Sequence, residues 1–269
     1  MILFNGFFDY KDNLVDYHSQ MFSLIHYIYM VLILFILICL LIAFKNTKHT
    51  TIDKYLKILS IYILLQEAIK IIWESHYDIK YHNSFNFEGL LPLYLCSLFM
   101  FTLPFVAFGK GKVKEYCLSF ITSVGIIGGL SNVFYLNILN VYPMFSFPTF
   151  VSIIYHFFMT FTGLLLLVSK YYIPNKSTPI KSLIIIIIFS IIVIPVNYYL
   201  QSKGFNPDYM LLMHGYGLPG ATIVSNFLIK HNMQFLFTFF IYFLYLIAGY
   251  IVTAIYYLII NLIKKIKTT

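Results

Sequence analysis

Seven long apolar stretches limit the folds that are open to this chain. A transmembrane helix needs about 20 predominantly apolar residues, and seven stretches approach that length. They are Phe22–Phe44, Tyr55–Trp73, Leu90–Phe108, Tyr116–Leu136, Thr149–Val168, Ser182–Leu200 and Phe235–Ile260. The sequence therefore predicts an all-α polytopic membrane helix bundle with seven transmembrane helices. No hydrophilic stretch is long enough for a second domain, so we expect residues 1–269 to form a single integral membrane domain.

The composition excludes several classes of protein. Only 10% of the 269 residues are charged and 60% are hydrophobic, whereas an ordinary soluble domain has about 25% charged residues. A soluble enzyme and a nucleic-acid-binding module are therefore excluded. All 18 basic residues are lysines, and the absence of arginine argues against bidentate phosphate recognition. The three cysteines give neither a disulfide framework nor metal-ligand spacing, so we expect no metal and no cofactor.

The lysines predict the orientation of the chain, because short cytoplasmic loops of membrane proteins retain positive charge. They gather in alternate loops and in the C-terminal tail: Lys45, Lys48, Lys54, Lys57, Lys110, Lys112, Lys114, Lys170, Lys176, Lys181, Lys264, Lys265 and Lys267. The opposite loops hold few lysines, and the N-terminal tail contains Asp9, Asp12 and Asp16. We therefore predict a multi-pass protein of the cell membrane with its N-terminus outside and its C-terminus inside.

This topology places several polar residues at a common depth. Cys96 and His156 lie six and seven residues into spans that run in the same direction, so both are expected about 10 Å below the outer boundary. Three polar residues of the second span fall in the same layer, and two asparagines belong to the outer half: Gln66, Glu67, Lys70, Asn132 and Asn197. Because an ionisable group inside a span costs a few kcal/mol unless it faces polar groups, the layer is a candidate site.

The chemistry of this layer has a catalytic and a structural interpretation. Cys96 and His156 together could form a nucleophile and its base, although a single histidine on an apolar helix is commonly a satisfied core residue. Pro92 is typical of the first position of a helix, which would put Cys96 in the second turn. Glu67 and Lys70 are spaced i,i+3 and could simply neutralise each other. Cys39 and Cys117 are interpreted as small apolar residues.

Three sequence features resemble a known family. They are the run Leu91-Pro92-Leu93-Tyr94-Leu95-Cys96, the Gln66-Glu67 pair and His156, with a weaker match in Asn206-Pro207-Asp208-Tyr209-Met210-Leu211-Leu212. They resemble the YwaF-like and transmembrane protein 164 family of multi-pass membrane acyltransferases. The resemblance implies that Cys96 carries the acyl group as a thioester and that His156 assists. Bacterial members often have histidine where this chain has Tyr94, which can donate a hydrogen bond but is no base near neutral pH.

The resemblance and the depth argument together predict a transacylase. Cys96 would attack an ester of a membrane phospholipid donor with His156 as general base, and Glu67 or Gln66 would orient the imidazole or the carbonyl. The acyl chain would then pass to a lysolipid, or to another amphipathic acceptor such as a lipoprotein, at the outer leaflet. Neither a metal nor coenzyme A is required. The alternatives are a transporter or channel, which predicts related halves and broken helices, and a noncatalytic assembly protein.

The remaining features have mainly structural interpretations. Gly125 and Gly129 form a G-x-x-x-G pattern that favours close helix packing. Pro195 is expected to kink its helix, with Asn197 satisfying a freed carbonyl. The long loop Gln201–Gln234 is predicted to lie in the membrane interface as a lid that contains Tyr209. His214 in this loop is a second choice for the catalytic base.

Overall fold

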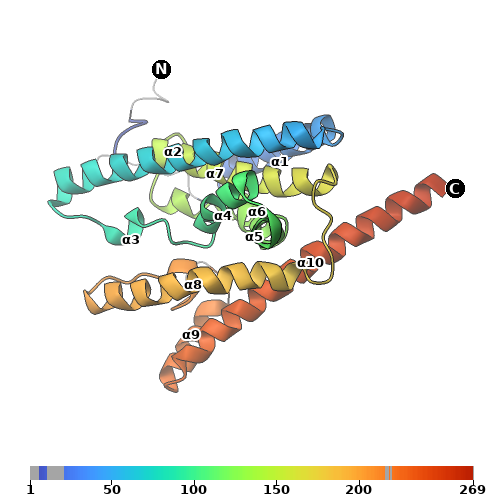
Figure 1. The fold of residues 1–269 in the computed structure, drawn as a ribbon. Helices are drawn as coiled ribbons and strands as arrows, with labels where there is room; N and C mark the ends of the chain where they lie inside the picture. The colour runs from blue at the N-terminus through green and yellow to red at the C-terminus, as the bar shows by residue number, and fades with distance from the viewer. Residues whose placement is uncertain (1–5, 11–20, 216–217, 219, 269) are drawn as a thin grey trace.

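The computed structural model describes residues 6–10, 21–215, 218 and 220–268, so Asp12 and Asp16 of the predicted acidic tail lie outside the described residues. Within these ranges the chain forms helices and loops and no strand, which confirms the all-α fold (Figure 1). The helices are α1 (Leu24–Phe44), α2 (His49–His82), α3 (Phe87–Leu90), α4 (Ser97–Phe108), α5 (Gly111–Ile121), α6 (Val124–Phe134), η2 (Asn137–Asn140), α7 (Phe147–Val168), α8 (Thr178–Ser202), η3 (Tyr209–Leu211), α9 (Ala221–Lys230) and α10 (Gln234–Thr268).

Five helical stretches of the described chain are long and apolar enough to cross a membrane. They are α1, the stretch Gly111–Asn140, α7, α8 and α10 up to Lys265. The predicted span Tyr55–Trp73 is helical throughout and Leu90–Phe108 in part, but α2 is rich in charged and polar residues and α4 has only 12 residues. An integral membrane protein is therefore supported, and the count of seven spans stays a prediction.

The third predicted span does not begin where its sequence suggested. Pro92 was expected at the first position of the helix, but α4 starts at Ser97 and Cys96 is its N-cap residue. Proline keeps the residue before it out of the helical conformation, and Leu91 is extended with φ −76° and ψ 121°. The segment 91–95 is irregular as a result. Cys96 thus lies at the start of the helix and not in its second turn.

The fourth predicted span is two helices rather than one. Between α5 and α6 the chain breaks at Thr122 and Ser123. The Thr122 hydroxyl donates to the Leu118 carbonyl at 2.7 Å, and the Ser123 hydroxyl donates to the Ser119 carbonyl at 2.5 Å. Such bonds from serine and threonine compete with the backbone ladder and bend helices. The break lets α6 turn toward α7.

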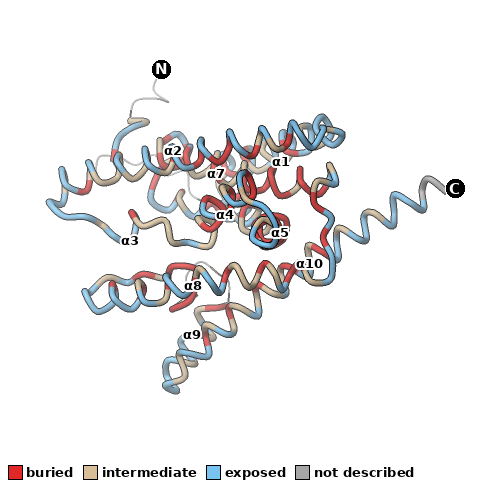
Figure 2. Tube along the Cα trace, in the orientation of Figure 1, coloured by how far each residue is buried: buried red, intermediate tan, exposed pale blue. Residues whose placement is uncertain are grey.

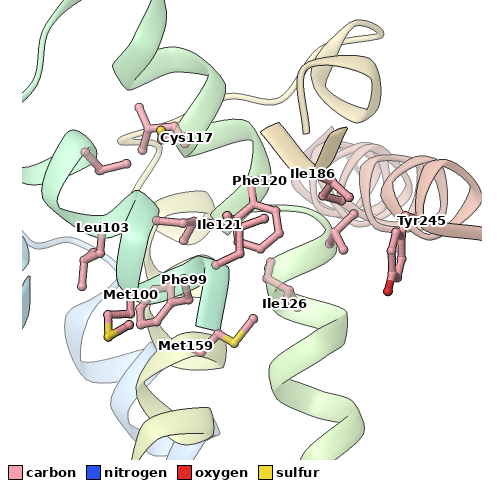
Figure 3. Packing of buried hydrophobic residues seen from close by; sticks show 14 of the residues in the cluster. Phe99, Met100, Leu103, Cys117, Phe120, Ile121, Ile126, Met159, Ile186 and Tyr245 are labelled. Carbon is pink, nitrogen blue, oxygen red and sulfur yellow. The ribbon is translucent and has the colours of Figure 1, made fainter. Parts of the chain in front are cut away.

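The bundle has a central group of helices between two outer groups. Helices α1, α2 and α7 lie on one side of α4, α5 and α6, and α8 and α10 lie on the other (Figure 1). The main core forms in the centre, where Phe99, Phe120, Ile121 and Met159 are fully buried (Figure 3). The distal half of α10 extends away from the bundle and is largely exposed (Figure 2).

Glycine allows α6 to approach α7 closely, as the G-x-x-x-G pattern predicted. A Cβ atom on Gly129 would clash with the Thr160 hydroxyl and would lie 3.0 Å from the His156 carbonyl oxygen. On the other side of the contact, a Cβ atom on Gly163 would lie 2.6 Å from the Ile121 carbonyl oxygen. Glycine at both positions therefore fixes α6 against the turn of α7 that contains His156.

Three of the lysine-rich segments meet at one end of the bundle. Lys114 of α5 lies 3.9 Å from the Asp53 carboxylate of α2 and donates to Tyr171 in the loop after α7 at 2.9 Å. Lys181 of α8 pairs with Glu115 of α5 at 2.5 Å. This common end agrees with the prediction that these loops share one face of the membrane, and the direction in which that face points stays a prediction.

Candidate functional site

Cys96 lies where the start of α4 meets α2 and α7. The Tyr155 hydroxyl of α7 donates to the Cys96 carbonyl at 2.9 Å and accepts from the Met100 backbone N–H at 3.2 Å. Tyr155 therefore bonds to both ends of the first turn of α4, where backbone groups have no partner within the helix. Cys96 as a whole residue is partly exposed, and its backbone is held in place by Tyr155.

His156 follows Tyr155 on α7 and is fixed by its own helix. Its Nδ1 lies 2.8 Å from the Ser152 carbonyl oxygen and 3.4 Å from the Ser152 hydroxyl. Because a carbonyl only accepts, the short contact assigns the proton to Nδ1 and leaves the lone pair on Nε2. A neutral imidazole with a free Nε2 can act as a general base. His156 is partly exposed, as Cys96 is.

Helix α2 brings a charged pair to the same place. Lys70 lies 3.1 Å from the Glu67 carboxylate, so the i,i+3 pair predicted from spacing is present. Lys70 acts electrostatically on both Cys96 and His156, and Glu67 also acts on Cys96. The Gln66 side chain donates to the Val151 carbonyl of α7 at 2.8 Å and ties α2 to α7. Lys70 thus interacts electrostatically with Cys96 and His156 around the α2–α4–α7 junction, and their common depth in the membrane stays a prediction.

The thiol and the imidazole share these neighbours but do not bond to each other. Among the described residues no hydrogen bond joins Cys96 to His156, and Ser152 fixes the imidazole in the place expected for Gln66 or Glu67. Their link runs through Tyr155, which adjoins His156 in sequence and bonds to the Cys96 carbonyl. Cys96 and His156 therefore lie on α4 and α7, which Tyr155 joins, and Lys70 acts electrostatically on both.

The loop after α8 packs into the bundle, which corrects the interfacial lid expected from its sequence. Tyr209 is fully buried, its hydroxyl donates to the Phe87 carbonyl at 2.7 Å, and its ring contacts the ring of Tyr94 at 5.1 Å. Asn197 accepts from the Tyr209 N–H at 3.1 Å and donates to its carbonyl at 3.2 Å. Asn197 therefore holds this loop and does not satisfy a carbonyl freed by Pro195, through which α8 continues.

Two further predicted residues, Asn132 and His214, lie on other elements than Cys96. Asn132 is on α6, and its side-chain oxygen is buried without a hydrogen bond among the described residues. His214 is half-buried in the loop, where its backbone N–H donates to the Asp208 carboxylate at 3.0 Å.

Tyr155 and Ser152 are the site residues that sequence reasoning missed. Ser152 had a usable signal, because it lies four residues before His156 and therefore on the same face of a helix. Tyr155 had none, since its partners Cys96 and Met100 lie more than 50 positions earlier in the chain. A contact of that sequence separation depends on how α4 and α7 pack.

Comparison with known proteins gives one match. The family model for the TMEM164 family matches residues 21–248, a range that contains α1 to α9 and part of α10. Neither the curated proteins nor the solved structures contain a match to this chain. The matched range includes every residue of the candidate site.

Proposed function

The chain belongs to the TMEM164 family, and we propose that it is a membrane acyltransferase that moves a fatty acyl chain from a phospholipid to a second amphipathic molecule through a thioester on Cys96. One observation carries the proposal. A partly exposed cysteine at a helix start is bonded through its carbonyl to Tyr155, the neighbour of a histidine whose Nδ1 faces the Ser152 carbonyl. A thiol and an imidazole that come within hydrogen-bond reach of each other form an activated nucleophile.

The surroundings of Cys96 suit the charge changes of acyl transfer. Negative charge develops on the thiol sulfur as it loses its proton and then on the carbonyl oxygen that it attacks. Lys70 acts electrostatically on Cys96 and is held by Glu67 at 3.1 Å. A fixed cation in a site that excludes water stabilises such charge more strongly than it would in water.

The proposed reaction has two steps. In the first, the Cys96 sulfur attacks the carbonyl carbon of a phospholipid ester while His156 Nε2 takes the thiol proton. The ester C–O bond breaks, His156 returns the proton to the departing oxygen, and a lysophospholipid leaves. In the second, a hydroxyl of a lysolipid, or an amine of a lipoprotein, attacks the thioester carbonyl. His156 takes its proton and passes it to the Cys96 sulfur as the C–S bond breaks.

A labelling experiment tests the first step. Purified protein incubated with a phospholipid that carries a labelled acyl chain should acquire a label that hydroxylamine removes, because hydroxylamine cleaves thioesters. Cys96→Ala should abolish the label. Cys39→Ala is the matched control, since Cys39 is exposed on α1 and should leave the label unchanged. A label that persists in Cys96→Ala, or no label in the unmodified protein, contradicts the proposal.

His156→Ala tests the assignment of the base. Loss of a general base typically lowers a rate by about 10²–10⁴-fold, so turnover should fall by that factor while insertion into the membrane is retained. Thioester formation measured by rapid quenching should fall with it. An unchanged rate of thioester formation would remove His156 from the mechanism.

Broken helices favour transport as a second candidate function. The chain is irregular over 91–95 and breaks between α5 and α6, and interrupted helices in transporters line substrate paths. A liposome flux assay with labelled lipid and polar solutes separates the two functions. Transport predicts flux that survives Cys96→Ala, whereas acyl transfer predicts new lipid species that disappear in this variant.

A further inference from the structure

An apolar groove runs between α4, α5 and α8 on the side of α4 that faces away from Cys96. Its volume is about 420 Å³, and its walls include Leu98, Phe101 and Phe105 of α4 and Ile185 and Ile188 of α8. The Cys96 carbonyl accepts instead from Tyr155 of α7, and Cys96 lies two residues before Leu98, about 200° around the helix. The groove is therefore separate from the candidate catalytic site.

The walls of the groove offer almost nothing to a polar ligand. Thr102 lines it, but the hydroxyl of this residue donates to the Leu98 and Phe99 carbonyls of its own helix at 2.8 Å and 3.2 Å. Phe101 of α4 and Phe189 of α8 approach each other with ring centroids 5.2 Å apart. From Ile184 to Ile192 the groove follows α8 for about 12 Å at 1.5 Å per residue.

One end of the groove is basic. Lys112, in the first turn of α5, lines it and is exposed. The neighbouring charges are already paired, since Lys114 interacts with Asp53 and Lys181 with Glu115. Among the described residues Lys112 has no ion-pair partner. A cation without a partner therefore lies at the mouth of an apolar channel.

We propose that this groove binds one acyl chain of an anionic glycerophospholipid whose phosphate lies at Lys112. The groove is part of helices that lie in the bilayer, where hydrocarbon is the solvent and an apolar channel is filled by a lipid tail. A tail attached to an anionic headgroup matches both parts of the feature. A lysine near the membrane surface attracts an anionic headgroup.

The bound lipid would pack against the side of α4 that is opposite to Cys96. One face of α4 lines the groove. The Tyr155 hydroxyl bonds to the Cys96 carbonyl at the start of the same helix. Helix α4 has only 12 residues, and a bound chain fills the space between it and α8. The proposal does not depend on the acyltransferase function, because it concerns binding and not reaction.

Photo-crosslinking of the intact protein tests the proposal without any variant. An anionic phospholipid with a diazirine near the end of one chain is incorporated into vesicles with the protein and activated by light. With the phosphate at Lys112, the chain end reaches the other end of the groove, so the crosslinked peptides should come from α4 and α8, near Leu98, Phe101 and Ile192. Crosslinks confined to other helices, or a lipid-free dimer in native mass spectrometry that Ile188→Trp dissociates and that shows a second copy in the groove, would overturn the proposal.

Two pairs of variants separate the tail from the headgroup. Ile188→Trp fills the groove and should weaken lipid binding in native mass spectrometry about tenfold, whereas Ile191→Trp, exposed on α8 outside the groove, should not. Lys112→Gln should reduce the preference for anionic over zwitterionic lipid about fivefold, whereas Lys110→Gln, also exposed, should not. Equal effects within either pair would contradict the proposal. Binding is measured in Cys96→Ala protein as well, so that a failure of catalysis cannot be mistaken for a failure of binding.

Discussion

The substitution Tyr155→Phe isolates the contact that holds the candidate nucleophile. It removes one hydroxyl and keeps the ring, which packs edge-on against Phe99 with centroids 6.0 Å apart. The hydroxyl makes two bonds, one to the Cys96 carbonyl and one from the Met100 N–H. Both bonds are local to the first turn of α4, so their loss should free the start of this helix without disturbing the core.

The magnitude follows from the groups that lose their partner. Met100 is buried with 4% of its surface exposed, and a buried N–H left without an acceptor costs about 1–3 kcal/mol. The Cys96 carbonyl still accepts from the Phe99 N–H at 2.9 Å, so losing its bond to Tyr155 costs less free energy. We expect Tyr155→Phe to lower the free energy of unfolding by about 2 kcal/mol. If only half of that energy serves to hold Cys96 in its reactive position, thioester formation slows about fivefold.

Tyr172→Phe is the matched control for this measurement. Tyr172 is buried to a similar degree, 9% against 7% exposed, and its hydroxyl also makes two bonds, with Ser119 at 2.8 Å and Thr178 at 3.1 Å. It lies at the lysine-rich end of the bundle, away from Cys96. It should therefore lose similar stability and keep the rate of thioester formation.

The assay compares thermal stability with single-turnover acylation of Cys96 over a range of lipid concentrations. Tyr155→Phe should lower the maximal acylation rate and leave the half-saturating lipid concentration unchanged, because it alters the position of the nucleophile and not the binding of lipid. If both tyrosine variants slow acylation in proportion to their loss of stability, Tyr155 is only a structural residue. If Tyr155→Phe acylates at the normal rate, the idea that it positions Cys96 is refuted.

Two further predictions concern packing around the site. Gly129→Ala should reduce acylation at least tenfold, because a methyl group there meets the backbone of α7 at His156. Gly128→Ala is the control, since its methyl group meets only the flexible end of Met159, and it should retain most activity in the same acylation assay. Asn197→Ala removes the amide that bonds to both the N–H and the carbonyl of buried Tyr209, and we expect about 1–3 kcal/mol lower stability. Limited proteolysis should then cleave the loop 205–214 faster.

The parts of the fold that sequence predicted well are those decided by local pattern. The lengths of the apolar stretches predicted the helices, because a backbone in lipid must satisfy its own hydrogen bonds and few structures other than a helix do so. The spacing of Glu67 and Lys70 gave their ion pair, since i,i+3 neighbours share a helix face. The G-x-x-x-G spacing gave the contact of α6 with α7, although not which helix would approach.

The parts that sequence missed depend on contacts between distant segments. The loop after α8 reads as amphipathic, and only its packing against Asn197 and Tyr245 decides that it is buried; Tyr245 donates to the Met210 carbonyl at 2.7 Å. The break at Thr122 uses residues that also occur in unbroken helices, so its position had no clear local signal. Hydropathy averaged over a window cannot locate either feature.

The two predicted spans that departed most from long apolar helices are the two that carry the polar half of the site. Helix α2 lowers its apolarity with Glu67 and Lys70, and α4 gives up the first turns of its predicted span so that Cys96 lies at a helix start. Both changes weaken a membrane span, because charge and unpaired backbone are costly in lipid. The cost is offset by specific partners: the ion pair within α2, and the Tyr155 hydroxyl at the start of α4. Departures from local rules that need such compensation are expected at functional sites. Here both departures, the charged pair of α2 and the late start of α4, lie around Cys96.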